Sequence, residues 1–371
     1  MIYLFVLGRD PELARIEIEC VLENEPSKFR ILDSSKNVAA VECEDINPKI
    51  IEKLGGIIKI AKVISNTSDP YDIENDLENC GLYSGNKNKT EYYIDHYNTH
   101  LLSLVEDFTK DYFKRMKIKA LYKKTAEPSK LARKDIIRKG LNLVIYKNYI
   151  GKAIAITNPL ELRARDIGRP SVDYAKVISI RLAKILINLS KIKKGETLLD
   201  PFAGSGTIMQ EAMLQGVNTI GADDDQNSVN EANKNLEWVK RKYGAAGNFR
   251  IVKADARNLA EKLKGKKVDA AVTEPYMGPF IRKLPNIPEA KTTASELSML
   301  YFDVIKNLSL LVKKGGRIAI LIPIFRTREN KKIFINFRNT AESCGFSIVY
   351  EPITYGHSKN KLLRQVYVLE K

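Results

Sequence analysis

Hydrophobic and polar positions follow two different periods over the first 65 residues. Short apolar runs predict strands, and apolar residues spaced three or four apart predict helices. The predicted order is strand, helix, strand, strand, helix, strand, in the segments IYLFVL, DPELARIEIECVLE, KFRIL, NVAAVEC, NPKIIEKLG and IIKIAKVIS. This order is the ferredoxin-like motif. We therefore predict that residues 1–65 form an N-terminal ferredoxin-like domain.

Residues 66–158 predict a second α+β domain. After the polar stretch GLYSGNKNKT, the pattern indicates the strand EYYIDHY, a long helix ending near Met116, the strand ALYKK, the basic helix KLARKDIIRKG and two closing strands, LNLVIY and GKAIAIT. Residues 159–175 show no periodicity and contain two prolines. We expect a linker there, because proline and irregular patterning mark connecting segments.

Residues 176–371 alternate regularly between strand and helix patterns. This alternation predicts an α/β fold with a mostly parallel sheet that helices cover on both faces. The last two predicted strands, FSIVYEPITY and RQVYVLE, have no helix between them. One of these two strands should therefore run antiparallel.

The charge of the chain is strongly positive and uneven. The formal net charge is +16, and the segment Lys114–Lys139 contains eleven Lys or Arg residues against two acids. Such a run is either a solvated helix face or a nucleic-acid surface. Interleaved Tyr112, Phe113 and Tyr122 favour the nucleic-acid surface, because aromatic rings can stack beside phosphate-binding cations. The candidate RNA-binding residues here are Lys114, Arg115, Lys117, Lys123, Lys124, Lys130, Arg133 and Lys134.

Composition excludes several other classes of protein. No apolar run approaches the roughly 18 residues of a membrane span, so we expect no membrane association. The first 20 residues read as a strand and a helix, not as a signal peptide. Four scattered cysteines and three histidines favour reduced cysteines, a cytoplasmic location and no metal site.

The most informative chemistry lies where predicted parallel strands end. In LLDPFAGSGTIMQEA, a strand ends at Asp200, Gly204 and Gly206 follow, and a helix begins. Glycines let backbone amides approach a ligand closely, and a helix N-terminus favours negative charge. The usual dinucleotide pattern is broken, because its third glycine would fall at Met209.

Two further strand ends carry aspartates. Asp223 lies 23 residues after Asp200, close to the spacing at which an acid reaches ribose hydroxyls. Asp255 closes the next strand and could accept a hydrogen bond from an adenine amino group. Each aspartate alone is better explained as a helix cap than as a ligand, and we expect one of the acids that follow Asp223 to be a cap. Acids at successive strand ends after a glycine loop nevertheless predict a nucleoside site.

The fourth strand end is TEPYMGP, residues 273–279. Taken in order, DPFAGSGT, GAD, ADAR and TEPY resemble the class I S-adenosylmethionine-dependent methyltransferases that methylate exocyclic amino groups. With the ferredoxin-like unit, a basic domain similar to THUMP RNA-binding domains and the RARDIGRP linker, nearly the whole chain resembles the archaeal-type tRNA guanine-10 N2-methyltransferases. The resemblance is specific in the catalytic loops and the linker, and only architectural in the first 150 residues.

This resemblance implies a role for each matching residue. The methionine part of S-adenosylmethionine would be lined by Asp200, Ala203, Gly204 and Gly206. The ribose would be held by Asp223 and the adenine by Asp255, while Glu274, Pro275 and Tyr276 would form the catalytic loop. In the linker, Arg165 and Arg169 would contact RNA or brace the domain interface, with hydrogen bonds to loop carbonyls an equal alternative. The implied partner is tRNA, with a monomer favoured over a homo-oligomer and the need for a small activating subunit left open.

The catalytic loop departs from the family pattern Asp-Pro-Pro-Tyr. One proline is missing and the acid is a glutamate, so TEPY aligns in two ways. We favour Glu274 in the place of the aspartate; with Thr273 there, no carboxylate would face the base. The alternatives are a non-catalytic tRNA-binding paralogue and an amino-methyltransferase acting on another RNA or DNA base. Methylation at C5 of a pyrimidine is excluded, because no cysteine lies near this loop.

Overall fold

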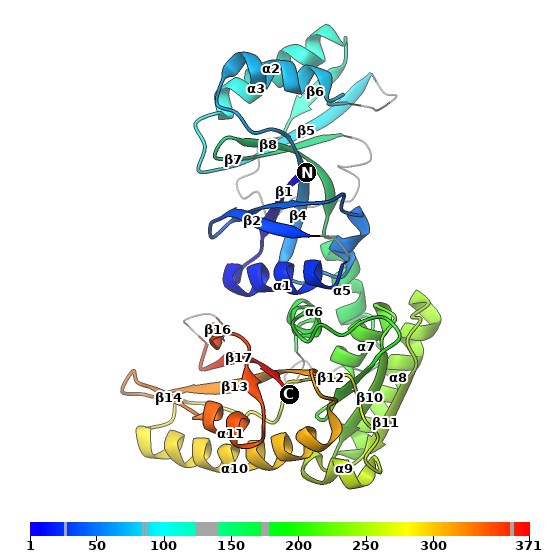
Figure 1. Ribbon diagram of the computed structural model, residues 1–371, viewed down its shortest axis with the longest axis vertical. Helices are drawn as coiled ribbons and strands as arrows, with labels where there is room; N and C mark the ends of the chain where they lie inside the picture. Colours follow the sequence, from blue (N-terminus) through cyan, green and yellow to red (C-terminus); the bar gives the residue numbers. More distant parts are fainter. Residues whose placement is uncertain (26–27, 84, 86–87, 124–139, 172–177, 357–359) are drawn as a thin grey trace. The chain divides into compact units, whose positions relative to one another are not determined.

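The computed structural model describes residues 1–25, 28–83, 85, 88–123, 140–171, 178–356 and 360–371. It divides into two compact units, residues 1–164 and residues 165–371. Each unit has its own sheet (Figure 1). Each also has its own clusters of buried hydrophobic residues.

The first unit begins with the predicted ferredoxin-like arrangement. Its elements are β1 (Ile2–Leu7), α1 (Pro11–Glu23), β2 (Phe29–Ser34), β3 (Val38–Cys43), the 3₁₀ helix η1 (Pro48–Glu52) and β4 (Ile57–Ser65). The strands are antiparallel and lie in the order β2-β3-β1-β4. The expected second α-helix is wrong: only five residues are helical there, with 3₁₀ geometry, too short for an amphipathic α-helical face.

The remaining elements of this unit extend the same sheet. They are α2 (Pro70–Asn79), β5 (Lys89–Tyr97), α3 (Leu102–Arg115), β6 (Lys119–Tyr122), β7 (Leu141–Tyr146) and β8 (Tyr149–Ile156). Because β8 pairs with β4, one eight-stranded sheet runs in the order β2-β3-β1-β4-β8-β7-β5-β6. The boundary at residue 65 stays a prediction. The predicted basic helix KLARKDIIRKG lies almost entirely outside the described residues.

The second unit is built on a mostly parallel sheet, as predicted. Its strands are β9 (Thr197–Asp200), β10 (Asn218–Asp223), β11 (Phe249–Lys253), β12 (Ala270–Thr273), β13 (Arg317–Arg326), β14 (Lys332–Phe334), β15 (Ser347–Ile348), β16 (Ile353–Tyr355) and β17 (Leu362–Glu370). The order is β11-β10-β9-β12-β13-β17-β15, with β14 on β13 and β16 on β17. The antiparallel strand expected at the end is β17, which pairs with β13 and β15.

Helices cover both faces of this sheet, so its central strands are apolar throughout. They are α6 (Ile180–Leu189), α7 (Thr207–Leu214), α8 (Gln226–Tyr243), η3 (Ala256–Asn258), α9 (Leu259–Lys262), α10 (Ile287–Leu311) and α11 (Phe337–Ser343). A further helix, α5 (Pro159–Ile167), contains the boundary between the two units. One core joins η3, α9, α10 and α11 to the strands, and another packs α7 against α8. Within the expected irregular linker, α5 is helical. Among the described helices, none has the length and apolar character needed to span a membrane.

Candidate active site

The site lies at the switch point of the second sheet, where β9 and β12 lie side by side. From β9 the chain proceeds outward through β10 to β11, and then returns to β12 on the other side of β9. These four strands are parallel, so their carboxyl ends meet at one edge. Ligands of doubly wound sheets bind beyond such an edge at the switch point. Asp200, Asp223, Asp255 and Glu274 are all brought to this edge.

Asp200 and Thr273 join the two strands that flank the switch point. The Thr273 hydroxyl donates to Oδ1 of Asp200 at 2.8 Å, and the Phe202 amide donates to the same oxygen at 3.2 Å. Both side chains are buried. Burial raises the pKa of Asp200 to about 7, because the charged carboxylate loses its hydration. Asp200 therefore lies beneath the glycine loop and ties it to the strand that precedes the TEPY loop.

The glycine loop is held from the next strand by Asp223. The Gly204 amide donates to Oδ2 of Asp223 at 2.8 Å, and the Ala203 amide donates to the Ala222 carbonyl at 2.8 Å. Gly204 and Gly206 have φ of +51° and +84°, which a side chain rarely permits. Gly206 directly precedes α7, whose first amides point toward the loop. The loop therefore presents backbone donors beside a half-buried carboxylate.

One of the acids that follow Asp223 has the expected capping role. Asp225 accepts from the amides of Asn227 and Ser228 and so caps α8. Its own amide donates to Oδ1 of Asp223 at 3.1 Å. Burial raises the pKa of the Asp223 carboxyl. Asp223 thus organises two loops with backbone hydrogen bonds and keeps its carboxylate at the strand end.

Asp255 has the geometry of a cap. It accepts from the Arg257 amide at 2.8 Å at the start of η3, and Nη2 of Arg257 donates to its Oδ2 at 2.6 Å. The hydrogen bond from the Arg257 guanidinium lowers the pKa of Asp255. Both carboxylate oxygens accept from Arg257, so a nucleobase amino group bound there would share Asp255 with that guanidinium.

The TEPY loop places its carboxylate against a cation from a distant strand. Glu274 directly follows β12, and its Oε1 accepts from Nε of Arg364 on β17 at 2.6 Å. The Glu274 side chain is 14% exposed and that of Arg364 is 30% exposed. The pair therefore lies at the mouth of the site, partly shielded from water.

The residues after Glu274 are anchored through their backbone. Pro275 is buried, and the Tyr276 carbonyl accepts from the Tyr301 hydroxyl on α10 at 2.7 Å. Burial raises the pKa of Tyr301, so its hydroxyl stays a donor. The Tyr276 ring itself is 55% exposed. The loop thus has a fixed backbone and an accessible aromatic side chain.

These contacts favour one of the two alignments of TEPY. Thr273 is fully buried and its hydroxyl is bonded to Asp200, so it does not face the mouth of the site. Glu274 places a carboxylate there.

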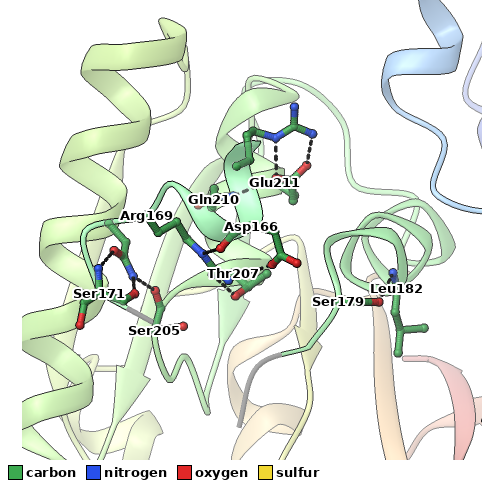
Figure 2. Close-up of polar contacts among 11 residues, drawn as sticks. Asp166, Arg169, Ser171, Ser179, Leu182, Ser205, Thr207, Gln210 and Glu211 are labelled. Carbon is green, nitrogen blue, oxygen red and sulfur yellow. Dashed lines mark hydrogen bonds and ion pairs between the residues drawn. The ribbon is translucent and has the colours of Figure 1, made fainter. Parts of the chain in front are cut away.

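Arg165 and Arg169 are both held by residues of their own unit, and Figure 2 shows Arg169 beside Asp166 and Thr207. The Arg169 side chain is fully buried and donates to the Thr207 hydroxyl and to the Asp166 carbonyl. Arg165 donates through Nε and Nη2 to the two carboxylate oxygens of buried Glu211, each at 3.1 Å. An RNA contact at Arg169 is therefore wrong, since a buried guanidinium has no surface to offer. Both arginines brace the segment onto α7.

The same segment also steadies the glycine loop. Asn235 on α8 accepts from the Ser171 amide at 3.0 Å and donates to the carbonyls of Ser171 and Ser205 (Figure 2). The segment expected to be a linker is thus hydrogen-bonded, through Thr207 and Asn235, to the residues that shape the glycine loop.

The basic cluster of the first unit is only partly described. Lys124, Lys130, Arg133 and Lys134 lie outside the described residues. Of the aromatic residues, Tyr112 and Phe113 are buried in the core, so they cannot stack on RNA. Tyr122 stacks on Tyr92 at 5.0 Å between ring centroids and donates to Glu106.

The described cations of this cluster have acidic neighbours. Arg115 pairs with Glu78 at 2.6 Å, and Nζ of Lys123 lies 3.6 Å from Glu91. Lys114 and Arg115 border a cleft of about 980 Å³ between α2 and α3 whose lining also includes four carboxylates. Lys117 is exposed at a positive φ of 55°. RNA binding by these residues stays a prediction.

Sequence reasoning missed Arg364, Tyr301 and the hydrogen bond between Thr273 and Asp200. A single arginine within the apolar strand LLRQVYVLE was the available signal for Arg364. Within the described part of the chain, no group of three or more His, Cys, Asp or Glu residues could hold a metal ion.

Two family models match the chain. The methyltransferase domain described as RMKL-like matches residues 169–336, and a DNA methylase model matches residues 53–234. The first match contains the glycine loop and the TEPY loop. The second ends before β11 and does not reach the TEPY loop.

Curated relatives match the chain over different lengths. It is 27% identical over 329 residues to the tRNA (guanine(10)-N2)-dimethyltransferase of Methanothermobacter thermautotrophicus. This match covers 86% of this chain and 88% of the relative. It is 32% identical over 140 residues to a protein of Methanothermococcus thermolithotrophicus named probable tRNA (guanine(10)-N2)-dimethyltransferase. That match covers 37% of this chain and 75% of the relative.

Solved structures share the fold over the full length. TrmN from Thermus thermophilus has a TM-score of 0.53 at 16% identity, with all of both chains covered. A possible methylase from Clostridium difficile has a TM-score of 0.50 at 14% identity, with 99% of this chain and 98% of the other covered.

Proposed function

Since this chain belongs to the tRNA guanine-10 N2-methyltransferase family, we propose that it transfers a methyl group from S-adenosylmethionine to the exocyclic N2 amino group of guanosine 10 in tRNA. One observation carries the proposal. At the switch point, beside the glycine loop, the Glu274 carboxylate is held by Arg364 and followed by the exposed ring of Tyr276.

The strand ends fit the cofactor's chemistry. When bound, S-adenosylmethionine supplies an electrophilic methyl group on a sulfonium. The glycine loop offers amides and carbonyls for the polar methionine end, and buried Asp200 fixes that loop from beneath. Asp223 offers carboxylate oxygens at the end of the next strand, suited to ribose hydroxyls. Asp255 is proposed for the adenine, whose amino group would share the carboxylate with Arg257.

Glu274 would activate the guanine amino group as a hydrogen-bond acceptor. The lone pair of that nitrogen is delocalised into the ring, so the nitrogen is a poor nucleophile. A carboxylate oxygen and a backbone carbonyl of the loop that accept its two N–H bonds localise the pair and stabilise the positive charge that develops. The hydrogen bond described for Glu274 uses Oε1, which leaves Oε2 for this contact. Tyr276 would stack on the base and fix its angle of attack.

The remaining parts of the proposal concern the partner. The basic cluster of the first unit would grip the tRNA backbone and present the target nucleotide to the site. Relatives named dimethyltransferases support the addition of two methyl groups. We propose a cytoplasmic location, because all four cysteines are free thiols. We propose a monomer, because one chain supplies every residue that the proposed site uses.

Two alternatives are less well supported. If the protein were a non-catalytic paralogue, nothing would explain why Arg364 holds the Glu274 carboxylate at the mouth of the site. An amino-methyltransferase of DNA is favoured by the DNA methylase model, but that match omits the TEPY loop, where amino specificity resides.

The test compares two transcripts that differ in one amino group. Wild-type protein is incubated with labelled S-adenosylmethionine and an unmodified tRNA carrying guanosine at position 10, and nucleosides are analysed by mass spectrometry. A second transcript carries inosine at position 10, which lacks the N2 amino group. We expect N2-methylated guanosine from the first transcript and no transfer to the second. Equal transfer to both would overturn the target position, and transfer to neither would overturn the activity.

A further inference from the structure

Exposed cations gather on three segments that are hydrogen-bonded to one another just beyond the TEPY loop. The segments are residues 276–285, 326–332 and 360–364. The exposed cations, which we call the cationic rim, are Arg282, Lys283, Arg328, Lys331, Lys332 and Lys361. Glu329 is the acid among them, in the turn between β13 and β14.

Hydrogen bonds between the three segments keep the rim together. Nζ of Lys361 donates to the Arg282 carbonyl at 2.6 Å, and Nε of Arg328 donates to the Leu284 carbonyl at 2.6 Å. The Arg328 amide donates to the Pro285 carbonyl at 3.0 Å. The rim is therefore a defined surface of the second unit.

The rim extends outward from the edge where the site lies. On β13, Ile320 pairs with Thr273 at the end of β12, and β13 continues to Arg326 before it turns into β14. At about 3.3 Å per residue, this hairpin carries its cations roughly 20 Å past the strand end. A nucleotide bound at Glu274 would have its neighbouring phosphates within reach of such an extension.

Four of the rim side chains are not used by the fold. Arg282, Lys283, Lys331 and Lys332 form no ion pair or side-chain hydrogen bond with other residues that the structure describes. Like charges held close without partners repel one another, so their clustering favours an anionic ligand. Close to them in sequence, Phe280 is 80% exposed and Tyr276 is 55% exposed.

We propose that the cationic rim binds the RNA strand that flanks the target nucleotide, as a phosphate-binding surface separate from the basic cluster of the first unit. Exposed cations beside exposed aromatic rings suit unpaired or splayed nucleotides, because phosphates are neutralised while bases stack. This inference rests on the proposed function. It adds a substrate contact on the catalytic unit itself, with Phe280 as the stacking residue next to the target.

The test uses three charge-reversal variants of the full chain. Arg282→Glu with Lys283→Glu and Lys331→Glu with Lys332→Glu alter the rim. Lys262→Glu with Lys266→Glu is the matched control, because these exposed lysines lie before β12, at the opposite edge of the sheet. Affinity for an unmodified tRNA transcript is measured by fluorescence anisotropy between 50 and 200 mM salt. Binding of labelled S-adenosylmethionine is measured alongside.

At low salt, each rim variant should bind tRNA at least about tenfold more weakly than the control. The slope of log affinity against log salt concentration should become shallower by roughly one to two, because fewer counterions are released. Binding of S-adenosylmethionine should be unchanged. Phe280→Ala should weaken tRNA binding by about tenfold without flattening the salt dependence. Rim variants with the affinity and salt dependence of the control would overturn the rim as a contact.

These outcomes separate the inference from the proposed function. A wild-type protein that binds tRNA without transferring methyl groups would overturn the proposed function, while the rim would still stand or fall by its variants. A wild-type protein that binds no tRNA would overturn both.

Discussion

Arg364 on β17 donates from Nε to Oε1 of Glu274, at 2.6 Å, across 90 positions of sequence. Glutamate has one more methylene than the aspartate of the Asp-Pro-Pro-Tyr pattern, so its carboxylate can occupy more positions. The arginine removes that freedom, because a guanidinium holds a carboxylate in a defined orientation. We infer that Arg364 is the residue that lets a glutamate serve in this loop.

Replacing Arg364 should therefore lower turnover more than it lowers affinity for S-adenosylmethionine. Arg364→Gln removes the charged donor, and we expect kcat to fall by about ten- to a hundredfold, since a displaced catalytic group is costly. Arg364→Lys keeps the charge without the planar geometry and should retain an intermediate rate. Steady-state kinetics separate kcat from KM, and affinity for S-adenosylmethionine is the control. A normal kcat in both variants would remove Arg364 from the reaction.

Changing Glu274 tests the carboxylate directly. Glu274→Gln keeps the size of the side chain but replaces one acceptor oxygen with a donor. The side chain then no longer has one acceptor oxygen for Arg364 and a second for the guanine amino group. We expect kcat to fall by about 10²- to 10⁴-fold, with binding of S-adenosylmethionine retained. Single-turnover methylation of the tRNA transcript is the measurement. Full activity in this variant would show that Glu274 is only a partner for Arg364.

Much of the architecture could be predicted from local pattern. Strand and helix periods are short-range properties, so the parallel sheet, the antiparallel last strand and the glycine loop at the first strand end were all visible in the sequence. The helix expected near Pro48 was wrong because a short apolar run does not distinguish a single 3₁₀ turn from a longer α-helix.

The site was predictable only in part, because partners of charged groups are set by tertiary contacts. Arginines are usually exposed, so the sequence suggests a surface position for Arg169. In the structure its guanidinium is buried and donates a hydrogen bond to Thr207. Tyr112 and Phe113 lie in a basic run, yet the helix turns both rings into the core. Glu274 could be identified from its loop, but its contact with Arg364 requires β17 to lie next to β13.

The buried carboxyl of Asp200 predicts a pH-dependent stability. Its pKa is raised from 3.8 to about 7 in the folded chain. Between these values the folded state binds a proton that the unfolded state has lost, so stability falls as pH rises, by up to roughly 1.4 kcal/mol per pH unit. The stabilising effect of protonation is complete below about pH 4 and lost above about pH 7.

Asp200→Asn should abolish this dependence, because the amide is neutral and its oxygen can still accept from Thr273. We expect the variant to exceed the wild type in stability above pH 7 and to converge with it at low pH. Urea unfolding from pH 5 to 8 is followed by fluorescence of Trp238, the single tryptophan, which lies on α8 in the same unit. Parallel curves for the two proteins would contradict a protonated Asp200.

The last prediction concerns the sheet of the first unit. Lys59 on β4 and Asp95 on β5 form an ion pair in which both side chains are buried, and Asn142 on β7 donates to the same Asp95 oxygen at 3.2 Å. Burial lowers the pKa of Lys59. The pair joins strands from the two predicted domains of this unit, 1–65 and 66–158, across β8 and β7.

Removing one charge should leave the other buried without a partner. Lys59→Met should lower the free energy of unfolding by about 3–5 kcal/mol, whereas Lys59→Met combined with Asp95→Leu should recover much of that loss. Circular dichroism during urea unfolding is the measurement. Because the pair spans both predicted domains, the single variant should destabilise residues 1–164 as one transition. Separate transitions, with only one of them shifted, would show instead that residues 1–65 and 66–158 unfold independently despite their common sheet.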